Sequence, residues 1–106
     1  MQISQFLRRA EGGIISHYCP ACRQMHGFFV DKPNPENGAH WRWDGNIVAP
    51  TFLPSMNITA KDDGEIFYCC HYRLENGQLE YLKDCTHALA GIKMALPPLP
   101  EFLRDR

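Results

Sequence analysis

The sequence predicts a mainly β fold built from hairpins, with one or two short helices added to it. Three observations support this prediction. The chain has 106 residues, which is the length of one ordinary domain. Its eight glycines and eight prolines make it rich in turns. Short runs of β-branched and aromatic residues lie between these turns, a pattern typical of strands rather than of a helical bundle.

The clearest element is a hairpin, because Asn76-Gly77 is the strongest short signal for a two-residue hairpin turn. Its strands are the flanking runs, residues 65–74 and 78–83. The turn predicts a register that pairs like residues across the hairpin: Leu74 with Leu79, and Tyr72 with Tyr81. Side chains alternate between the two faces of a strand, so Cys70 shares the apolar, core-facing side and His71 faces the opposite side.

Other elements are shorter. Two strands are expected beside Cys19-Pro20-Ala21-Cys22, at residues 14–18 and 27–30. A short helix is expected from His87 through Ala90, because Thr86 can cap its start and Gly91 can close its end. The proline-rich residues 97–100 are expected to form a semi-rigid extended tail.

Five cysteines and five histidines are the unusual part of the composition. The first six residues lack a basic region followed by an apolar stretch, and no apolar run approaches the ~18 residues of a membrane span. An odd cysteine count without a secretory signal argues against a disulfide framework. We therefore expect reduced thiols in a cytoplasm and no membrane contact. The net charge of −1 excludes a broadly basic nucleic-acid binder.

Clustered reduced thiols indicate a metal site. Cys19 and Cys22 have the two-residue gap that lets two sulfurs converge on one tetrahedral ion. Cys70 lies on the core face of the hairpin, and His87 lies just beyond the partner strand. The sequence therefore predicts one zinc-binding domain over residues 1–106, with a zinc-ribbon-like character. The expected Zn²⁺ ligands are Cys19, Cys22, Cys70 and His87.

The choice of ligands is less clear than the metal. His26 and His71 are alternative ligands, or hydrogen-bond partners of the ligands. His71 points away from Cys70 in a regular strand, although a bulge at Cys69-Cys70 would bring it to the same side. Cys69 and Cys85 are expected to be small buried residues rather than ligands.

Two other uses of the cysteines fit poorly. A thioredoxin-like site needs its first cysteine at a helix N-terminus, whereas a strand follows Cys22 here. A zinc deaminase needs H-x-E and P-C-x-x-C, and neither pattern is present. The sequence patterns of zinc metalloproteases, P-loops and α/β-hydrolases are absent as well.

Several motifs occur in one order along residues 15–97: Cys19-Pro20-Ala21-Cys22 with His26, Trp41-x-Trp43, Pro50-Thr51-Phe52-x-Pro54-Ser55, Cys70-His71, and residues 84–91 (DCTHALAG). Together they resemble a family of short phage and prophage proteins of uncharacterised function, whose members often carry an "ammonia monooxygenase" label. The resemblance implies a phage or prophage origin, a bacterial host and a Cys/His metal site. It implies no reaction.

The leading functional hypothesis is a small accessory protein whose structural zinc holds the fold together and which binds a protein or nucleic-acid partner. This hypothesis favours a non-enzyme and assigns no catalytic residues. One alternative is a zinc-dependent hydrolase in which His26 or His71 acts on a metal-bound water. The other is a nucleic-acid-binding module that uses Trp41, Arg42 and Trp43 as a stacking platform.

Overall fold

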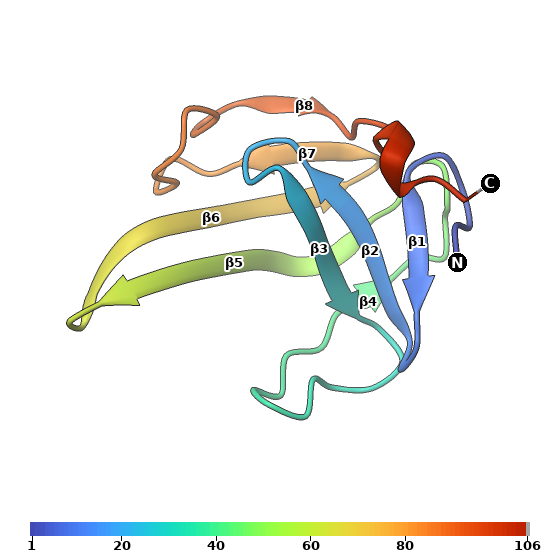
Figure 1. The fold of residues 1–106 in the computed structure, drawn as a ribbon, viewed down its shortest axis with the longest axis horizontal. Helices are drawn as coiled ribbons and strands as arrows, with labels where there is room; N and C mark the ends of the chain where they lie inside the picture. The colour runs from blue at the N-terminus through green and yellow to red at the C-terminus, as the bar shows by residue number, and fades with distance from the viewer. Residues whose placement is uncertain (106) are drawn as a thin grey trace.

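Two antiparallel β-sheets make up the fold (Figure 1), as seen in a computed structural model that describes residues 1–105. The smaller sheet has the order β1-β2-β3, and the larger has the order β4-β5-β6-β7-β8. The strands of the smaller sheet are β1 (Leu7–Ala10), β2 (Ile14–Cys19) and β3 (Gln24–Phe29). The strands of the larger sheet are β4 (Arg42–Trp43), β5 (Phe52–Asp62), β6 (Glu65–Glu75), β7 (Gln78–Tyr81) and β8 (Lys93–Ala95). A single 3₁₀ turn, η1 (Glu101–Leu103), follows near the C-terminus.

The hydrophobic core lies between the two sheets. In β2 every second residue is buried, as expected when one face of an antiparallel strand packs inward. Figure 1 shows β2 and β3 crossing over the long strands β5 and β6. The buried residues of both sheets form one cluster, whose largest side chains are Tyr72, Tyr81, Phe28 and Phe52.

The predicted register of the β6–β7 hairpin is confirmed. Tyr72 pairs with Tyr81, Leu74 with Leu79, and Glu75 with Gln78. Asn76 and Gly77 have φ values of 49° and 70°, the positive angles that a tight two-residue hairpin turn requires.

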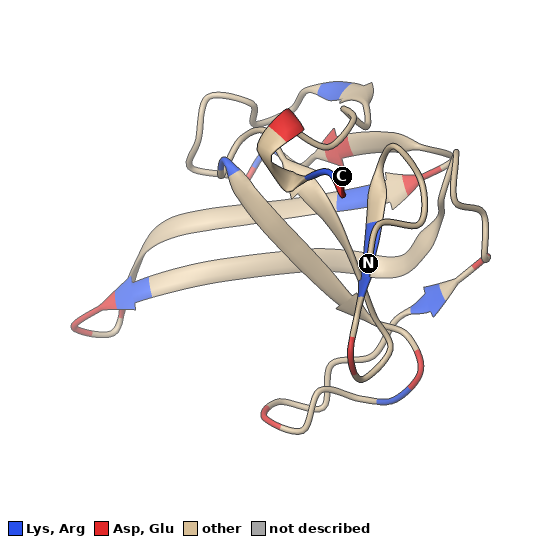
Figure 2. Cartoon of the chain, turned by 45° about the vertical axis from the view of Figure 1, so that its right-hand side comes forward, with Lys and Arg blue, Asp and Glu red and all other residues tan. Residues whose placement is uncertain are grey.

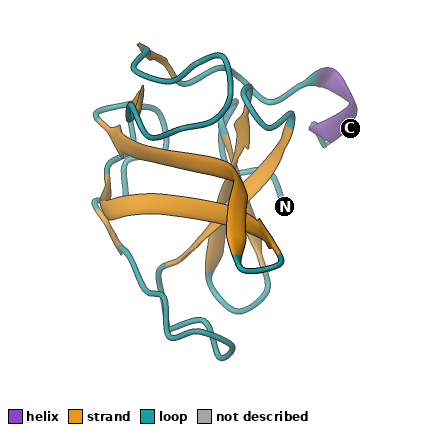
Figure 3. Cartoon of the chain, turned by 90° about the vertical axis from the view of Figure 1, so that its left-hand side faces the viewer, coloured by secondary structure: helices purple, strands orange, loops and turns teal. Residues whose placement is uncertain are grey.

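The mainly β prediction is confirmed, but the helix expected at residues 87–90 is wrong. The chain there forms turns, because the hydroxyl of Thr86 accepts the backbone N–H of Cys69 at 2.9 Å instead of capping a helix. Near the N-terminus, Ile3, Phe6, Leu7 and Ala10 have the spacing of a helix face, but the chain forms strand β1 there. The sheet arrangement does not establish a zinc ribbon. Figure 3 shows that strands make up nearly all the regular structure, with one short helical turn near the C-terminus. Among the described residues, no helix is long and apolar enough to cross a membrane.

The C-terminal tail is docked on the body of the protein. Leu99, within the proline-rich segment, is fully buried, and its backbone N–H donates to the carbonyl of Gln5 at 2.8 Å. The tail is therefore anchored beside the segment that precedes β1.

Strand β5 carries an irregularity that matters for the site. Phe52 pairs with Leu74, but the next pair is Met56 with Tyr72, so three residues of β5 face one residue of β6. This is a β-bulge, a feature that changes the direction of side chains at functional sites. Ser55 is the last residue of this bulge.

A buried polar network crosses between the sheets. The hydroxyl of Tyr72 lies 2.7 Å from Nε2 of His17 and 3.0 Å from Nδ1 of His26. Both histidines are buried, and burial lowers the pKa of each ring, to about 3 for His17. These rings are therefore neutral at physiological pH and depend on the tyrosine for hydrogen bonding.

Replacing Tyr72 with Phe should destabilise the fold. The change leaves two buried ring nitrogens without their partner, at a cost of about 1–3 kcal/mol each. Urea denaturation would measure this loss. The matched change Tyr18→Phe should cost no more than about 0.5 kcal/mol, because Tyr18 is only half-buried. Equal losses in the two variants would contradict the prediction.

Candidate functional site

Strand β6 carries two different groups of reactive side chains on its two faces. Cys70 is fully buried and faces the core, whereas His71 faces the outer side of the sheet. Cys70 pairs with Ile58 of β5, and His71 pairs with Asn57. The strand is regular here, without the bulge that would bring Cys70 and His71 together.

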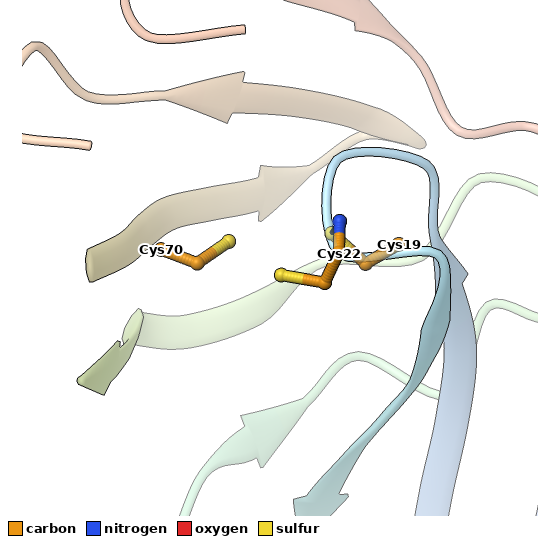
Figure 4. A group of neighbouring side chains, drawn as sticks. All are labelled: Cys19, Cys22 and Cys70. Atoms are coloured by element: carbon orange, nitrogen blue, oxygen red, sulfur yellow. Dashed lines mark hydrogen bonds between the residues drawn. The ribbon is translucent and has the colours of Figure 1, made fainter. Parts of the chain in front are cut away.

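On the inner face, three cysteines form a thiol cluster (Figure 4). The sulfur atoms of Cys19, Cys22 and Cys70 all lie within 4.8 Å of one another, close enough to hold a metal ion. Cys19 and Cys22 come from the turn between β2 and β3. Arg23 closes this turn with a φ of 57° and an N–H that donates to the carbonyl of Cys19 at 2.8 Å.

The thiol cluster favours a thiolate at Cys19. A hydrogen bond from the Cys70 thiol is the largest cause that lowers the pKa of Cys19, to about 5. Burial of Cys19 raises this pKa, and the Tyr81 hydroxyl, 3.1 Å from the sulfur, lowers it. The backbone N–H of Cys22 also donates to this sulfur, at 3.5 Å. The pKa of Cys70 is raised, chiefly because its proton is held by Cys19. Thiolates are the form in which cysteines bind metal.

Two histidines near the thiol cluster have an unpaired ring nitrogen. Among the described residues, Nε2 of His26 and Nε2 of His87 are the buried side-chain nitrogens or oxygens without a hydrogen-bond partner. Neither nitrogen lies within the 4.8 Å group of the three sulfurs. The ring of His87 packs edge-on against Tyr81, with 4.9 Å between ring centres, and close to Tyr68. These two tyrosines bond to Cys19 and Cys22 respectively.

The hydrogen bonds also determine which nitrogen of each ring carries the proton. His17 Nδ1 faces a carbonyl and must donate, so its Nε2 accepts from Tyr72. The tyrosine oxygen then accepts from Nδ1 of His26, which leaves a free lone pair on its Nε2. In His87, Nδ1 accepts the N–H of Leu89 at 3.2 Å, so Nε2 carries the proton in the neutral ring.

On the outer face, His71 lies between a serine and an aspartate. Its Nε2 is 3.1 Å from Oγ of Ser55, and its Nδ1 is 3.0 and 3.2 Å from the two carboxylate oxygens of Asp84. A carboxylate only accepts, so Nδ1 carries the proton and Nε2 is free to accept from the serine hydroxyl. The side chains of His71 and Asp84 are 23% and 58% exposed, so a substrate can reach them. This is the hydrogen-bond order of a serine-hydrolase catalytic triad.

Separate elements of the fold position the members of this triad. Ser55 ends the β5 bulge, and Trp41 Nε1 donates to its carbonyl at 3.3 Å. Asp84 belongs to the segment that follows β7 and continues alongside β6. In that segment, the thiol of Cys85 donates to the carbonyl of His71 at 3.1 Å and accepts its N–H at 3.2 Å. The carbonyl of His71 also accepts the backbone N–H of Leu82 at 2.8 Å, so Cys85 supplies with its side chain the acceptor that the His71 N–H needs.

The sequence alone does not reveal this triad. From the sequence, His71 is an alternative metal ligand, a hydrogen-bond partner of the ligands or a residue that acts on a metal-bound water, and Ser55 and Asp84 have no assigned role. The sequence does contain one signal. The predicted register places His71 on the face opposite Cys70, where it cannot share a metal ion with Cys70 and must have another role. The sequence could not reveal the partner of His71, because the β5 bulge decides where Ser55 points.

Comparison of the sequence with known protein families identifies one family that matches most of the chain. Residues 2–82 match the family model described as bacterial ubiquitination-like system serine protease (BubE). The chain belongs to the BubE family. No curated protein matches the chain, and no solved structure matches it.

Membership of the BubE family corrects two expectations. An accessory protein that acts by binding is the wrong function, because the family is one of serine proteases. The phage and "ammonia monooxygenase" resemblance finds no support in the family match.

The tryptophans proposed for nucleic-acid stacking pack on the core instead: Trp41 lies edge-on to Phe28, and Trp43 stacks on Phe52 at 5.9 Å between ring centres. Figure 2 shows that the positions of positive and negative residues are interspersed along the chain rather than gathered by sign.

The contacts of Cys85 predict the effect of changing it. Cys85→Ser should keep both bonds to the His71 backbone and cost within roughly 1 kcal/mol. Cys85→Ala leaves the N–H of His71 without its partner, whereas the carbonyl keeps the bond from the N–H of Leu82, and the change should cost about 1–3 kcal/mol. Thermal denaturation of the two variants would measure the difference. An alanine variant as stable as the serine variant would show that these contacts contribute nothing.

Proposed function

We propose that this BubE-family protein is a serine protease of a bacterial ubiquitination-like system, with Ser55, His71 and Asp84 as its catalytic triad. The observation that carries the proposal is the continuous hydrogen-bonded chain from Ser55 through His71 to Asp84. Membership of the BubE family supports the reaction class. The exposure of the triad on the outer face supports access by a protein substrate.

Each member of the triad has one role in the proposed mechanism. The hydroxyl oxygen of Ser55 attacks the scissile carbonyl carbon while Nε2 of His71 takes its proton. Asp84 accepts the Nδ1 proton, holds the ring in the correct tautomer and stabilises the imidazolium that forms. His71 then gives the proton to the leaving amine, and an ester of Ser55 remains. A water, activated by His71, hydrolyses this ester and restores the hydroxyl.

We further propose that the thiol cluster binds one Zn²⁺ with a structural role. Three converging thiols, one of them with a strongly lowered pKa, are a donor set that suits zinc. A bound ion would tie the β2–β3 turn to β6 and add folding energy to a domain with a small core. All five cysteines are free thiols, which agrees with a reducing bacterial cytoplasm as the place of action.

The fourth zinc ligand comes from His87 or His26, and different observations support each. His87 lies against the two tyrosines that bond to the cluster sulfurs. His26 has the tautomer that a metal needs at Nε2, held by the Tyr72 and His17 network. His87 would have to give up the hydrogen bond from Leu89 to reach that tautomer.

The triad proposal predicts selective labelling. A fluorophosphonate probe, which reacts with activated serine hydroxyls, should label the wild-type protein at Ser55, and Ser55→Ala should abolish the labelling. Asp84→Asn should slow it on the order of 10⁴-fold, because the amide stabilises the wrong tautomer of His71. Ser16→Ala is the matched control on strand β2 and should label normally. Labelling that persists in Ser55→Ala would refute the assignment.

The metal proposal predicts about one zinc per chain and a fold that weakens when the metal is removed. Structural zinc sites contribute on the order of 10 kcal/mol of apparent binding energy, so a chelator should lower the melting temperature sharply. Elemental analysis should find zinc in Cys85→Ser but not in Cys22→Ser. His87→Ala and His26→Ala should differ, and the variant that loses the metal identifies the fourth ligand. Equal zinc in the two cysteine variants would exclude the thiol cluster as the site.

A further inference from the structure

The edge of strand β5 is open beside Ser55. Strand β4 pairs only with Phe52 and Leu53, whereas β5 continues to Asp62. Among the described residues, no strand pairs with this side of β5 beyond Leu53. An unpaired strand edge presents a row of backbone donors and acceptors that can bind another extended chain.

The register shows which backbone groups face this open edge. The N–H and carbonyl of His71 bond to Cys85 and Leu82, on the side of β6 away from β5. His71 and its β5 partner Asn57 are therefore a pair without mutual hydrogen bonds. In such a pair both backbones point outward, so the N–H and carbonyl of Asn57 face the open edge.

Thr59 is oriented in the same way. Its partner Cys69 bonds through its N–H and carbonyl to Thr86, again on the far side of β6. Asn57 and Thr59 thus present two N–H groups and two carbonyls at the open edge, and none of the four has a partner among the described residues.

A groove runs along this edge. It has a volume of about 450 Å³. Residues 56–59 of β5 line it, together with Gly27 and Phe29 of β3 and with Asn34, Asn37, Ala39 and Trp41. Trp41 lines the groove and bonds to the carbonyl of Ser55, so its ring closes the edge next to the catalytic serine. A chain that follows the groove toward Ser55 must leave the edge there and pass the outer face, where Oγ of Ser55 lies.

We infer that the substrate is an extended peptide segment that binds as an added strand along Asn57–Thr59, with its scissile bond at Ser55. The inference rests on the proposed function and adds how the substrate is recognised. Backbone hydrogen bonds give the affinity in this mode, and they require an unfolded segment or tail rather than a folded surface. From Ser55 to Thr59 the strand covers about four residues at ~3.3 Å each, so about four substrate residues on one side of the scissile bond should be needed.

The first test uses random-sequence decapeptides, with cleavage followed by mass spectrometry and fluorophosphonate labelling measured in parallel. Thr59→Pro removes one N–H at the open edge without removing a hydrogen bond to β6. It should slow decapeptide cleavage at least tenfold and leave labelling of Ser55 unchanged. Thr59→Ala, the matched comparison, removes the side chain but keeps the N–H, so it should slow decapeptide cleavage much less than Thr59→Pro does.

The outcomes separate this inference from the proposed function. Undiminished cleavage by Thr59→Pro, or an equal loss in Thr59→Ala, would overturn the added strand. A wild-type protein that is labelled but cleaves no decapeptide would overturn it too. A wild-type protein that is not labelled would overturn the proposed function, and this inference with it.

A second test leaves the protein unchanged and guards against a proline variant that fails to fold. The best-cleaved decapeptide is synthesised with a single N-methyl group at each position in turn and given to the wild-type protein. Only alternate residues of an added strand direct their N–H groups to β5. Cleavage should therefore fall about tenfold at alternate positions on one side of the scissile bond and remain at the positions between them. A uniform response would overturn the inference.

Discussion

The alignment of residues 82–87 with strand β6 is the constraint on which both groups of reactive side chains depend. Strand β7 ends at Tyr81, yet the chain stays beside β6. Backbone N–H groups of Leu82 and Thr86 donate to the carbonyls of His71 and Cys69, and side chains add further bonds. The thiol of Cys85 bonds to both backbone groups of His71, and Thr86 bonds to both backbone groups of Cys69. This alignment directs Asp84 to His71 and, three residues later, places His87 beside the tyrosines of the thiol cluster. A shift of this segment by one residue along β6 would move Asp84 away from His71 and His87 away from the tyrosines.

Alternation along β6 keeps the two kinds of chemistry apart. Cys70 faces the core with Cys19 and Cys22, and its neighbour His71 faces outward with Ser55 and Asp84. A metal held inside the core would therefore be shielded from substrate, whereas the triad is open to it. A serine protease needs no metal for its reaction, but it needs its three side chains held to within a fraction of an ångström. A small domain gains such rigidity from a metal site more readily than from its limited core.

The sequence was most informative where local rules decide the structure. Asn76-Gly77 determines its own turn, and the turn determines the register that pairs Tyr72 with Tyr81. The spacing of Cys19 and Cys22, together with the core-facing position of Cys70, was enough to predict the thiol cluster. The helix at residues 87–90 failed because Thr86 has a better partner in β6, a tertiary contact that capping rules do not consider. The triad depends on contacts between three segments and on a bulge, and no short motif encodes it.

The same bulge also links the reaction to substrate binding. It turns Ser55 toward His71, and beyond it β5 continues past the short strand β4, so the catalytic serine lies where the open edge begins. An exposed edge favours unwanted pairing, and natural proteins usually cover it. Strand β4 covers the edge of β5 only as far as Leu53, two residues before Ser55. Trp41 closes only the end of the groove. An open strand edge beside Ser55 lowers solubility, but it can bind an extended chain. This use would explain why Asn57 and Thr59 are exposed.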